Sequence, residues 1–214
     1  MRLLFVGPPG SGKGTQCEVL SQRLGTPHIS TGELLREAVK AGGIAGRRAQ
    51  RFMSAGRLVP DRLVLRILEA RLAKPDVREH GYLLDGFPRT IAQARAFETL
   101  PGAQGFDAVI ELALPRSVVI DRLAARGRTD DIQQSVQRRL EIYERVTVPM
   151  IAWCAERYPL IKVAADRPVE VVTAEVLRRL DQLRGIAPEP EPEPTRASVR
   201  PAATVERDSG KQAH

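Results

Sequence analysis

Residues 7–15 read GPPGSGKGT and hold the side chains best suited to phosphate chemistry, because they lie between a short apolar run and a helical pattern. Glycines let successive backbone N–H groups point at phosphate oxygens, and a helix N-terminus adds a partial positive charge. Lys13 should then reach the β- and γ-phosphates of a nucleoside triphosphate. A glycine-rich turn with a surface lysine is the alternative, which the flanking strand and helix disfavour. The residues expected to bind the triphosphate here are Gly10, Ser11, Gly12, Lys13, Gly14 and Thr15.

Two further side chains in this pattern suit a divalent cation. Gly14 stands where the phosphate-loop consensus has Ser or Thr, so the hydroxyl nearest the metal is expected to be Thr15. Asp85 ends the apolar run YLLD, and the carboxyl end of a parallel strand faces the ligand crevice. We interpret Asp85 as the residue that holds Mg²⁺ through bound water. A turn-forming aspartate before Gly86 is the alternative.

The elements that position these residues follow from the alternation of short apolar runs with longer helical patterns. This alternation predicts an α/β fold of the P-loop NTPase-like, three-layer kind, with a five-stranded parallel sheet flanked by helices. The strands are expected at residues 2–6, 27–30, 82–85, 108–112 and 160–163. The helices are expected at residues 13–24, 32–41, 61–72, 91–99, 115–125, 130–157 and 168–184.

Composition narrows the class of protein further. The chain has 214 residues and a net charge of +7, so it favours anionic partners and a nucleic-acid-binding role has to be considered. Aromatic residues make up only 4%, which argues against a stacking platform for single strands. Cys17 and Cys154 form no CxxC pair and are expected to be buried thiols. The first apolar run is too short for a signal peptide or a membrane span, so a cytoplasmic location is expected.

The last part of the chain differs in character from residues 1–185. From Pro188 the sequence reads PEPEPEPT and then continues as a polar run to His214. Alternating proline and glutamate cannot bury apolar surface and favours an extended chain. We therefore predict a single domain over residues 1–185 and a disordered Pro/Glu-rich tail over residues 186–214. The tail could be a solvated extension or a tether.

A phosphate loop by itself is shared by kinases, GTPases and ATPases, so other segments must decide between them. Four do so: HISTGELLR at residues 28–36, GRLVPD at 56–61, LDGFPR at 84–89 followed by Gln93, and an arginine-rich segment. The last segment contains Arg122, Arg126, Arg128, Asp130, Asp131 and Arg139. In this order, and together with the phosphate loop, these motifs resemble the adenylate kinase family over residues 1–185.

The resemblance implies reversible transfer of a phosphoryl group from Mg-ATP to AMP, giving two ADP. Such a transfer gathers many negative charges, which arginine neutralises by bidentate hydrogen bonds. The resemblance implies a catalytic set of Lys13, Arg89, Arg126, Arg128 and Arg139. It adds Arg122, Arg126 and Arg167 to the phosphate loop as ATP-binding residues. The AMP-binding residues that it implies are Thr31, Gly32, Leu35, Arg36, Met53, Val59, Val64, Gly86, Arg89, Gln93, Arg128 and Arg139.

The identity of the acceptor base depends on few residues. In the resembling family Thr31 lies beside the base and the Gln93 amide hydrogen-bonds adenine, whereas uridylate and cytidylate kinases typically carry Ala at the position of Thr31. A uridylate/cytidylate kinase or another small P-loop kinase is therefore the nearest alternative. A basic regulatory protein that binds nucleotides or nucleic acid without catalysis is the more distant one. We expect ATP, AMP and ADP as ligands, with no nucleic acid or membrane partner, and a monomer.

The resemblance also implies two mobile segments. Residues 31–60 correspond to the helical insertion that binds AMP, and residues 123–131 to the lid over ATP. Here a single glycine separates Arg126 from Arg128, so we predict a vestigial lid. Long-lid members often carry four metal-binding cysteines in this segment, and the short connection here leaves no place for such a zinc site.

Overall fold

The computed structural model describes residues 1–126 and 133–185, with the backbone alone at 126, 133 and 134. Its sheet has five parallel strands in the order β2-β3-β1-β4-β5. They are β1 (Arg2–Val6), β2 (His28–Ser30), β3 (Tyr82–Asp85), β4 (Ala108–Ala113) and β5 (Leu160–Ala164). The predicted α/β architecture with an all-parallel five-stranded sheet is confirmed, and each strand lies within one residue of its expected bounds.

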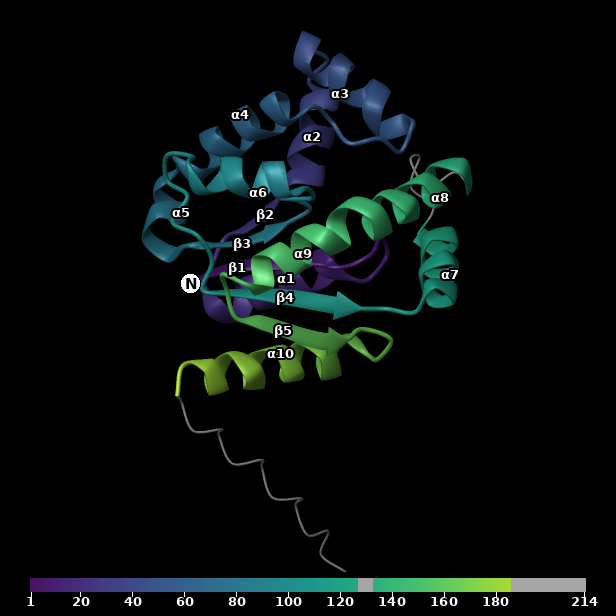
Figure 1. Ribbon diagram of the computed structural model, residues 1–214. Helices are drawn as coiled ribbons and strands as arrows, with labels where there is room; N and C mark the ends of the chain where they lie inside the picture. The colour runs from purple at the N-terminus through teal and green to yellow at the C-terminus, as the bar shows by residue number, and fades with distance from the viewer. Residues whose placement is uncertain (127–132, 186–214) are drawn as a thin grey trace, which may run out of the picture.

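Strand register brings the carboxyl ends of the central strands to one edge of the sheet. β1 lies between β3 and β4, with Phe5 opposite Asp85 on one side and Ile110 on the other. Ser30 at the end of β2 lies opposite the same Asp85. In Figure 1 the arrowheads of β4 and β5 point toward α7, so the residues after every strand gather at that end. This is the edge where open parallel sheets bind ligands.

Alternate side chains of β1, β3 and β4 pack in two separate cores. Leu3 and Phe5 of β1 pack in the cluster that contains residues of α1 (Lys13–Leu24) and α10 (Val169–Leu183). Leu4 and Val6 pack in the cluster that contains residues of α4 (Asp61–Leu72), α6 (Ile91–Glu98) and α9 (Val148–Ala155). Two layers of helices therefore enclose the sheet, as Figure 1 shows, and burial of each large side chain stabilises the fold by about 1.5–3 kcal/mol.

The helices between β2 and β3 extend away from the sheet. α2 (Thr31–Lys40) and α3 (Ile44–Ser54) pack on each other at the top of Figure 1, and α4 and α5 (Pro75–His80) lead back to β3. The Ser30 hydroxyl accepts a hydrogen bond from the N–H of Glu33 and so begins α2 as its N-cap. α5 was not expected from the sequence; it is a short helix with Pro75 in its first turn, where a missing N–H costs nothing.

The helix expected at residues 130–157 is interrupted in its described part. It is divided into α8 (Gln133–Ile142), the π-helical turn η1 (Tyr143–Thr147) and α9, while residues 130–132 lie outside the described part. Pro149 has no N–H for the carbonyl four residues earlier, and the N–H of Val148 bonds Tyr143 O, five residues earlier. The single long helix was therefore wrong in its middle, because one proline changes the hydrogen-bond pattern. α7 (Arg116–Arg126) precedes it.

A buried polar contact fixes α1, the helix that follows the phosphate loop, against α10. The Gln16 amide donates to Val169 O at 3.0 Å, and the Thr173 hydroxyl donates to Gln16 Oε1 at 2.8 Å. Gln16 and Thr173 are almost wholly buried, so these bonds satisfy groups that water cannot reach. The contact limits how far the helix can rotate about its axis.

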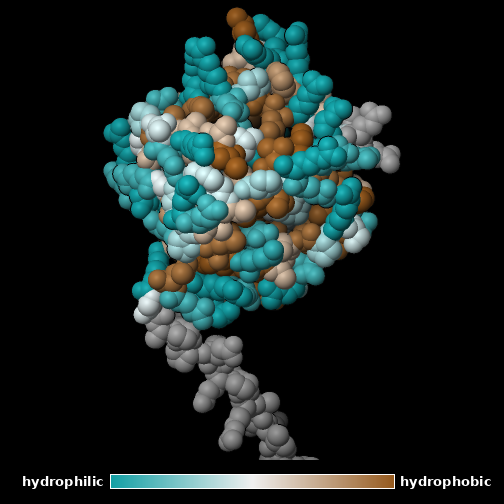
Figure 2. All heavy atoms as spheres, in the orientation of Figure 1, coloured by the Kyte–Doolittle hydropathy of each residue, from teal (hydrophilic) through white to brown (hydrophobic). Residues whose placement is uncertain are grey.

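The outer surface in the view of Figure 2 is mostly hydrophilic at its rim. Hydrophobic atoms gather in the hollow between the upper helices, α2 to α4, and the layer below them. Among the described residues, no helix is both long enough and apolar enough to cross a bilayer.

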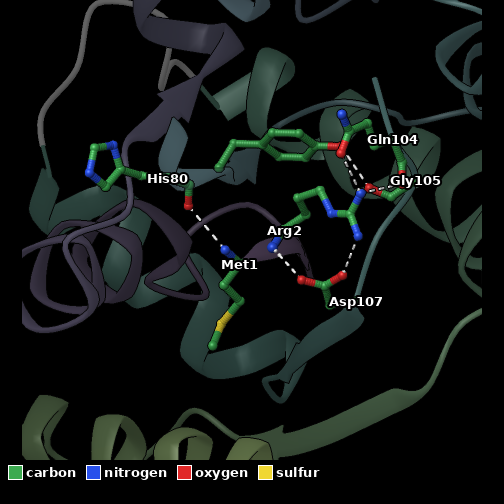
Figure 3. A network of polar contacts seen from close by, with 7 residues as sticks. Met1, Arg2, His80, Gln104, Gly105 and Asp107 are labelled. Carbon is green, nitrogen blue, oxygen red and sulfur yellow. Dashed lines mark hydrogen bonds and ion pairs between the residues drawn. The ribbon is translucent and has the colours of Figure 1, made fainter. Parts of the chain in front are cut away.

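The opposite, amino-terminal edge of the sheet is held by a network around the start of the chain (Figure 3). The Met1 amino group donates to His80 O at 3.0 Å, and the Tyr82 hydroxyl donates to Gly105 O at 2.6 Å. Arg2 donates to Asp107 twice, from its backbone N–H at 2.8 Å and from its guanidinium at 2.7 Å. The first residues of β1 and β3 are thus tied to the turn that precedes β4, far from the edge that binds ligands.

Asp107→Asn should lower the free energy of unfolding at pH 7 by about 1 kcal/mol, a figure kept small because the side chain is partly exposed. Partial burial alone would raise the pKa of Asp107, but the hydrogen bonds and charge of Arg2 outweigh it and lower that pKa. A carboxylate with a depressed pKa stabilises the fold above its unfolded pKa, and this contribution is lost as the pH falls.

Urea unfolding of both proteins at pH 7 and below about pH 4 measures the effect. The gap between wild type and variant should narrow at the lower pH. A gap that is independent of pH would show that the carboxylate charge contributes nothing.

Candidate functional site

A cavity of about 750 Å³ opens at the carboxyl edge of the sheet, a volume within the usual range for small-ligand sites. Its walls come from the phosphate loop, the ends of β2 and β3, helices α2, α7 and α8, and the loop between β5 and α10. Every site residue expected from the sequence whose side chain the structure describes lies on this wall. They are Gly10, Ser11, Gly12, Lys13, Gly14, Thr15, Thr31, Gly32, Leu35, Arg36, Met53, Val59, Val64, Asp85, Gly86, Arg89, Gln93, Arg122, Arg139 and Arg167.

The structure does not describe the side chains of two arginines of the predicted set, Arg126 and Arg128. The backbone of Arg126 ends α7, so residues 123–126 of the predicted lid continue that helix. Arg128, together with Asp130 and Asp131, lies outside the described residues. The part of the lid between α7 and α8 therefore stays a prediction.

The phosphate loop leaves β1 with a backbone that only glycine adopts easily. Gly7 has φ 146°, and a Cβ there would lie 2.6 Å from Leu112 O of the neighbouring strand. Gly10 has φ 79°, and a Cβ there would press on Leu123 of α7 at 3.2 Å. Ser11 N–H closes a turn on Pro8 O at 3.2 Å, after which α1 begins at Lys13. Glycine at these positions lets the loop curl tightly in front of the helix N-terminus.

Lys13 folds back into this loop. Its ammonium group donates to the carbonyls of Gly7 and Pro8, each at 3.0 Å, and to Ser11 Oγ at 3.4 Å. The pKa of Lys13 is lowered to about 8, chiefly by burial; the charge of Asp85 opposes this change, and the positive charges of Arg89 and Arg139 add to it. A cation held in this way is stabilised by an incoming anion more than a surface lysine would be.

Asp85 lies beside the phosphate loop at the end of β3. A Cβ on Gly14 would come 3.8 Å from Asp85 Oδ2, so the carboxylate faces the first turn of α1. Thr15, in the same turn, lines the cavity with it. No cluster of three or more His, Cys, Asp or Glu that could hold a metal occurs among the described residues. One carboxylate and one hydroxyl fit Mg²⁺, which keeps several waters and takes other ligands from phosphate.

The cavity is strongly cationic. Arg89 donates from Nε to Gly86 O at 2.7 Å, and Arg167 donates to Ala164 O at 3.2 Å while pairing with Glu175 at 3.7 Å. These bonds set the direction of both guanidinium groups. Carboxylates are fewer on the wall, namely Glu18, Glu33 and Asp85, against Lys13, Arg36, Arg57, Arg89, Arg122, Arg139 and Arg167. The surplus of positive charge, contributed by separate elements, suits a ligand with many anionic oxygens.

Beyond the arginines the cavity becomes more apolar. Leu35, Val59 and Val64 are nearly buried, and they line the wall together with Met53. The Thr31 hydroxyl donates to Asp85 O at 3.2 Å, which joins the start of α2 to the end of β3. Gly86 follows at φ 84°, and a Cβ there would come 2.9 Å from Thr31 Oγ1. Only glycine therefore allows this close approach.

Gln93 is the polar group in this apolar part, and its amide is already engaged at both ends. It is 2% exposed, Oε1 accepts from Arg89 N–H at 2.8 Å, and Nε2 donates to Asp61 Oδ1 at 2.7 Å. The Thr90 hydroxyl accepts from Gln93 N–H at 3.0 Å and caps α6. The sequence pattern Thr-x-x-Gln is that of a capping box, but Gln93 Oε1 accepts from the N–H of Arg89 and not from that of the N-cap Thr90. Asp61 ends the GRLVPD segment, but no local pattern indicates that it bonds Gln93, and this role was not expected from the sequence.

The segment that follows α3 reaches across the cavity to α8. Arg138 donates from its guanidinium to Ala55 O at 3.2 Å. A Cβ on Gly56 would lie 2.8 Å from Ser135 O, so the backbones nearly touch. The helices at residues 31–60 and the helix after the predicted lid therefore meet along one side of the cavity.

Comparison with known proteins agrees with this geometry. Residues 5–158 match the family model described as adenylate kinase. A protein of Nostoc sp. PCC 7120 named adenylate kinase 1 is 44% identical over 177 residues, which is 82% of this chain and 96% of the relative. An adenylate kinase of Synechococcus sp. WH7803 is 46% identical over 174 residues, covering 80% of this chain and 94% of the relative.

A third relative extends the comparison to another group of bacteria. The adenylate kinase of Corynebacterium glutamicum strain R is 41% identical over 182 residues, which covers 84% of this chain and 99% of the relative. The family match includes the phosphate loop from its first glycine, the segment that carries Gln93 and the described arginines of α7 and α8. With this agreement over most of its length, the chain belongs to the adenylate kinase family.

Proposed function

We propose that this protein transfers a phosphoryl group reversibly from Mg-ATP to AMP, giving two ADP by direct in-line displacement. One observation carries the proposal: a single cavity joins a phosphate loop to a second, apolar pocket, with arginines between them. A cavity that held one nucleotide would need only one of these two ends. Membership of the adenylate kinase family supports the same reading, since the relatives compared above bear that name.

The donor nucleotide occupies the end of the cavity formed by the phosphate loop. Backbone N–H groups of Gly10, Ser11, Gly12, Gly14 and Thr15 and the N-terminus of α1 hold its phosphates. Lys13 leaves its loop carbonyls for the β- and γ-phosphates. Arg122 of α7 and Arg167, which both line the cavity, lie against the donor base, and Arg126 completes the donor set.

The acceptor AMP occupies the other end. Arg36 and Arg89 bind its phosphate, and Thr31 and Gln93 meet its base. Gln93 retains one N–H and one lone pair for this purpose. Its Nε2 uses one of two N–H groups to bond Asp61, and its Oε1 uses one of two lone pairs to accept from Arg89. The rest of the acceptor pocket consists of Gly32, Leu35, Met53, Val59, Val64 and Gly86.

Two residues at the donor end of the cavity would hold the magnesium ion that accompanies ATP. Asp85 would hold it through water, with the Thr15 hydroxyl nearby. Bound there, Mg²⁺ neutralises charge on the phosphate oxygens. The protein's own contribution is to direct the Asp85 carboxylate at this position from the end of a rigid strand.

Arginines stabilise the phosphoryl group during transfer. Arg89 and Arg139 line the cavity, and we assign Arg126 and Arg128 to the same catalytic set. The attacking atom is an oxygen of the AMP phosphate, which is already anionic at neutral pH, so no side chain has to remove a proton. Catalysis then depends on orientation and on positive charge aimed at the oxygens of the transferring group.

Closure of two segments completes the site. Residues 31–60 form the AMP-binding insertion, residues 123–131 a small lid, and residues 186–214 a tail with no part in the reaction. The match to the Desulforudis audaxviator relative spans 213 positions and that to the Corynebacterium relative 182, for the same 84% of this chain. The longer match therefore includes a stretch that this chain lacks, and we place that stretch at the lid. The enzyme acts as a cytoplasmic monomer and needs no nucleic acid or membrane.

Transfer from Mg-ATP to AMP, UMP, CMP and GMP in parallel tests the acceptor. We expect AMP to be preferred by at least about 100-fold in kcat/KM, because a site that hydrogen-bonds a base edge rejects bases that leave those groups unpaired. Lys13→Ala should remove nearly all transfer. Preference for UMP or CMP would keep the mechanism and overturn the acceptor. ATP binding without transfer to any acceptor would favour a regulatory nucleotide-binding protein.

Nucleotide binding should draw a proton onto Lys13. Its pKa is lowered to about 8, so close to half of the side chain is neutral at pH 8 in the free protein. Phosphate oxygens favour the ammonium form and raise that pKa again. Binding of ATP at pH 8 should therefore take up about half a proton, and at pH 6.5 almost none.

Calorimetry in two buffers of different ionisation enthalpy measures this uptake. Lys13→Arg keeps a positive charge that does not titrate in this range, and should bind ATP without the uptake. Equal uptake by the variant would assign the proton to another group.

A further inference from the structure

We propose that Asp61 is a positioning residue that sets the base specificity of the acceptor site, by fixing the direction of the Gln93 side-chain amide. The inference rests on the proposed function, in which Gln93 meets the acceptor base. Asp61 is exposed, begins α4 and does not line the cavity, so it acts on the base only through Gln93.

The two partners of the Gln93 amide differ in what they can do. The Arg89 N–H, 2.8 Å from Oε1, can only donate a hydrogen bond. The Asp61 carboxylate, 2.7 Å from Nε2, can only accept one when it is ionised. Rotating the amide by half a turn would set donor against donor and acceptor against acceptor. Because Gln93 is 2% exposed, water could not replace the two lost bonds.

The amide therefore offers the cavity one donor and one acceptor in a fixed order. Its second N–H and the second lone pair of Oε1 remain for a ligand. Adenine presents an amino group at position 6 and a ring nitrogen that accepts beside it. A 6-oxopurine presents an acceptor at position 6 and a protonated ring nitrogen beside it. With the direction of the amide fixed, the 6-amino group of adenine can donate to Gln93 Oε1. A 6-oxo group in the same place would set its oxygen against Oε1, and two acceptors repel each other.

Asp61 is the part of this arrangement that a side-chain substitution can change. Its bond to Gln93 is charge-assisted, and such bonds are about twice as strong as neutral ones. It also joins the start of α4 to the start of α6, two helices that contribute Val64 and Gln93 to the cavity. Asparagine at this position could accept from the amide or donate to it. One of the two constraints on the direction of Gln93 would then be removed.

The test compares AMP with inosine monophosphate, which differs at position 6 and in the protonation of the adjacent ring nitrogen. In Asp61→Asn the ratio of kcat/KM for AMP to that for inosine monophosphate should fall about tenfold, through a higher KM for AMP and a lower one for the 6-oxopurine. The KM for ATP should stay the same, because the donor end is untouched. A purely structural role of Asp61 would lower activity toward both acceptors alike and leave the ratio unchanged.

Matched variants complete the experiment. Asp61→Ser also replaces the carboxylate with a group that donates or accepts, and carries the test should the asparagine variant fail to fold. Asp61→Glu keeps the carboxylate and should restore the wild-type ratio. Asp76→Asn makes the same change in the first turn of α5, where Asp76 pairs with Arg71 away from the cavity, and should leave the ratio unchanged.

The outcomes separate this inference from the function on which it rests. A wild-type preference for AMP that persists in both Asp61→Asn and Asp61→Ser would overturn the inference alone. An equal loss of preference in Asp76→Asn would overturn it as well, because the effect would then be general. A wild-type protein that transfers no phosphoryl group to AMP would overturn the proposed function and the inference together.

Discussion

The rest of this structure depends on how the ammonium group of Lys13 is held, by hydrogen bonds to the backbone carbonyls of the phosphate loop. Removing a cation from water is unfavourable unless oxygen atoms surround it, and here Gly7 and Pro8 supply them. The loop can curl around the side chain only because glycines give it a left-handed backbone, and β1 must end where the loop begins. An anionic ligand then replaces weak carbonyl partners with a full opposite charge, which is how the fold favours phosphate over water.

The positive charges around Lys13 destabilise one another in the folded protein when no ligand is bound. Arg89 and Arg139 both lower the pKa of Lys13, because each guanidinium charge repels the nearby ammonium group. The chain offsets this repulsion by bringing the arginines from separate elements and by burying two apolar cores beneath them. The sheet and helices thus hold the cations of the site near one another despite this repulsion. A polyanionic ligand would relieve this repulsion, because its negative charges lie among the cations.

Much of the sheet was predictable because its signals are local. Each strand is a short apolar run, and the side chains at the strand ends must share an edge once the sheet is parallel, which brought Asp85 to the phosphate loop as expected. The predicted helices were wrong where a single proline determines the local hydrogen-bond pattern. Pro149 lacks one N–H and turns the predicted long helix into α8, a π turn and α9. The extra helix at Pro75 is a short, capped turn whose sequence shows no hydrophobic period.

Contacts between distant segments account for what the sequence could not provide at the site. Gln93 was identified as a residue facing the base, yet nothing near it indicates that Asp61, 32 positions earlier, holds one end of its amide. An isolated glutamine can read either of two opposite base edges, so its presence alone does not determine a preference. The direction of the amide does, and that direction arises only when the fold brings the start of α4 to the start of α6. Specificity at this site is therefore a property of the fold as much as of the residue that touches the ligand.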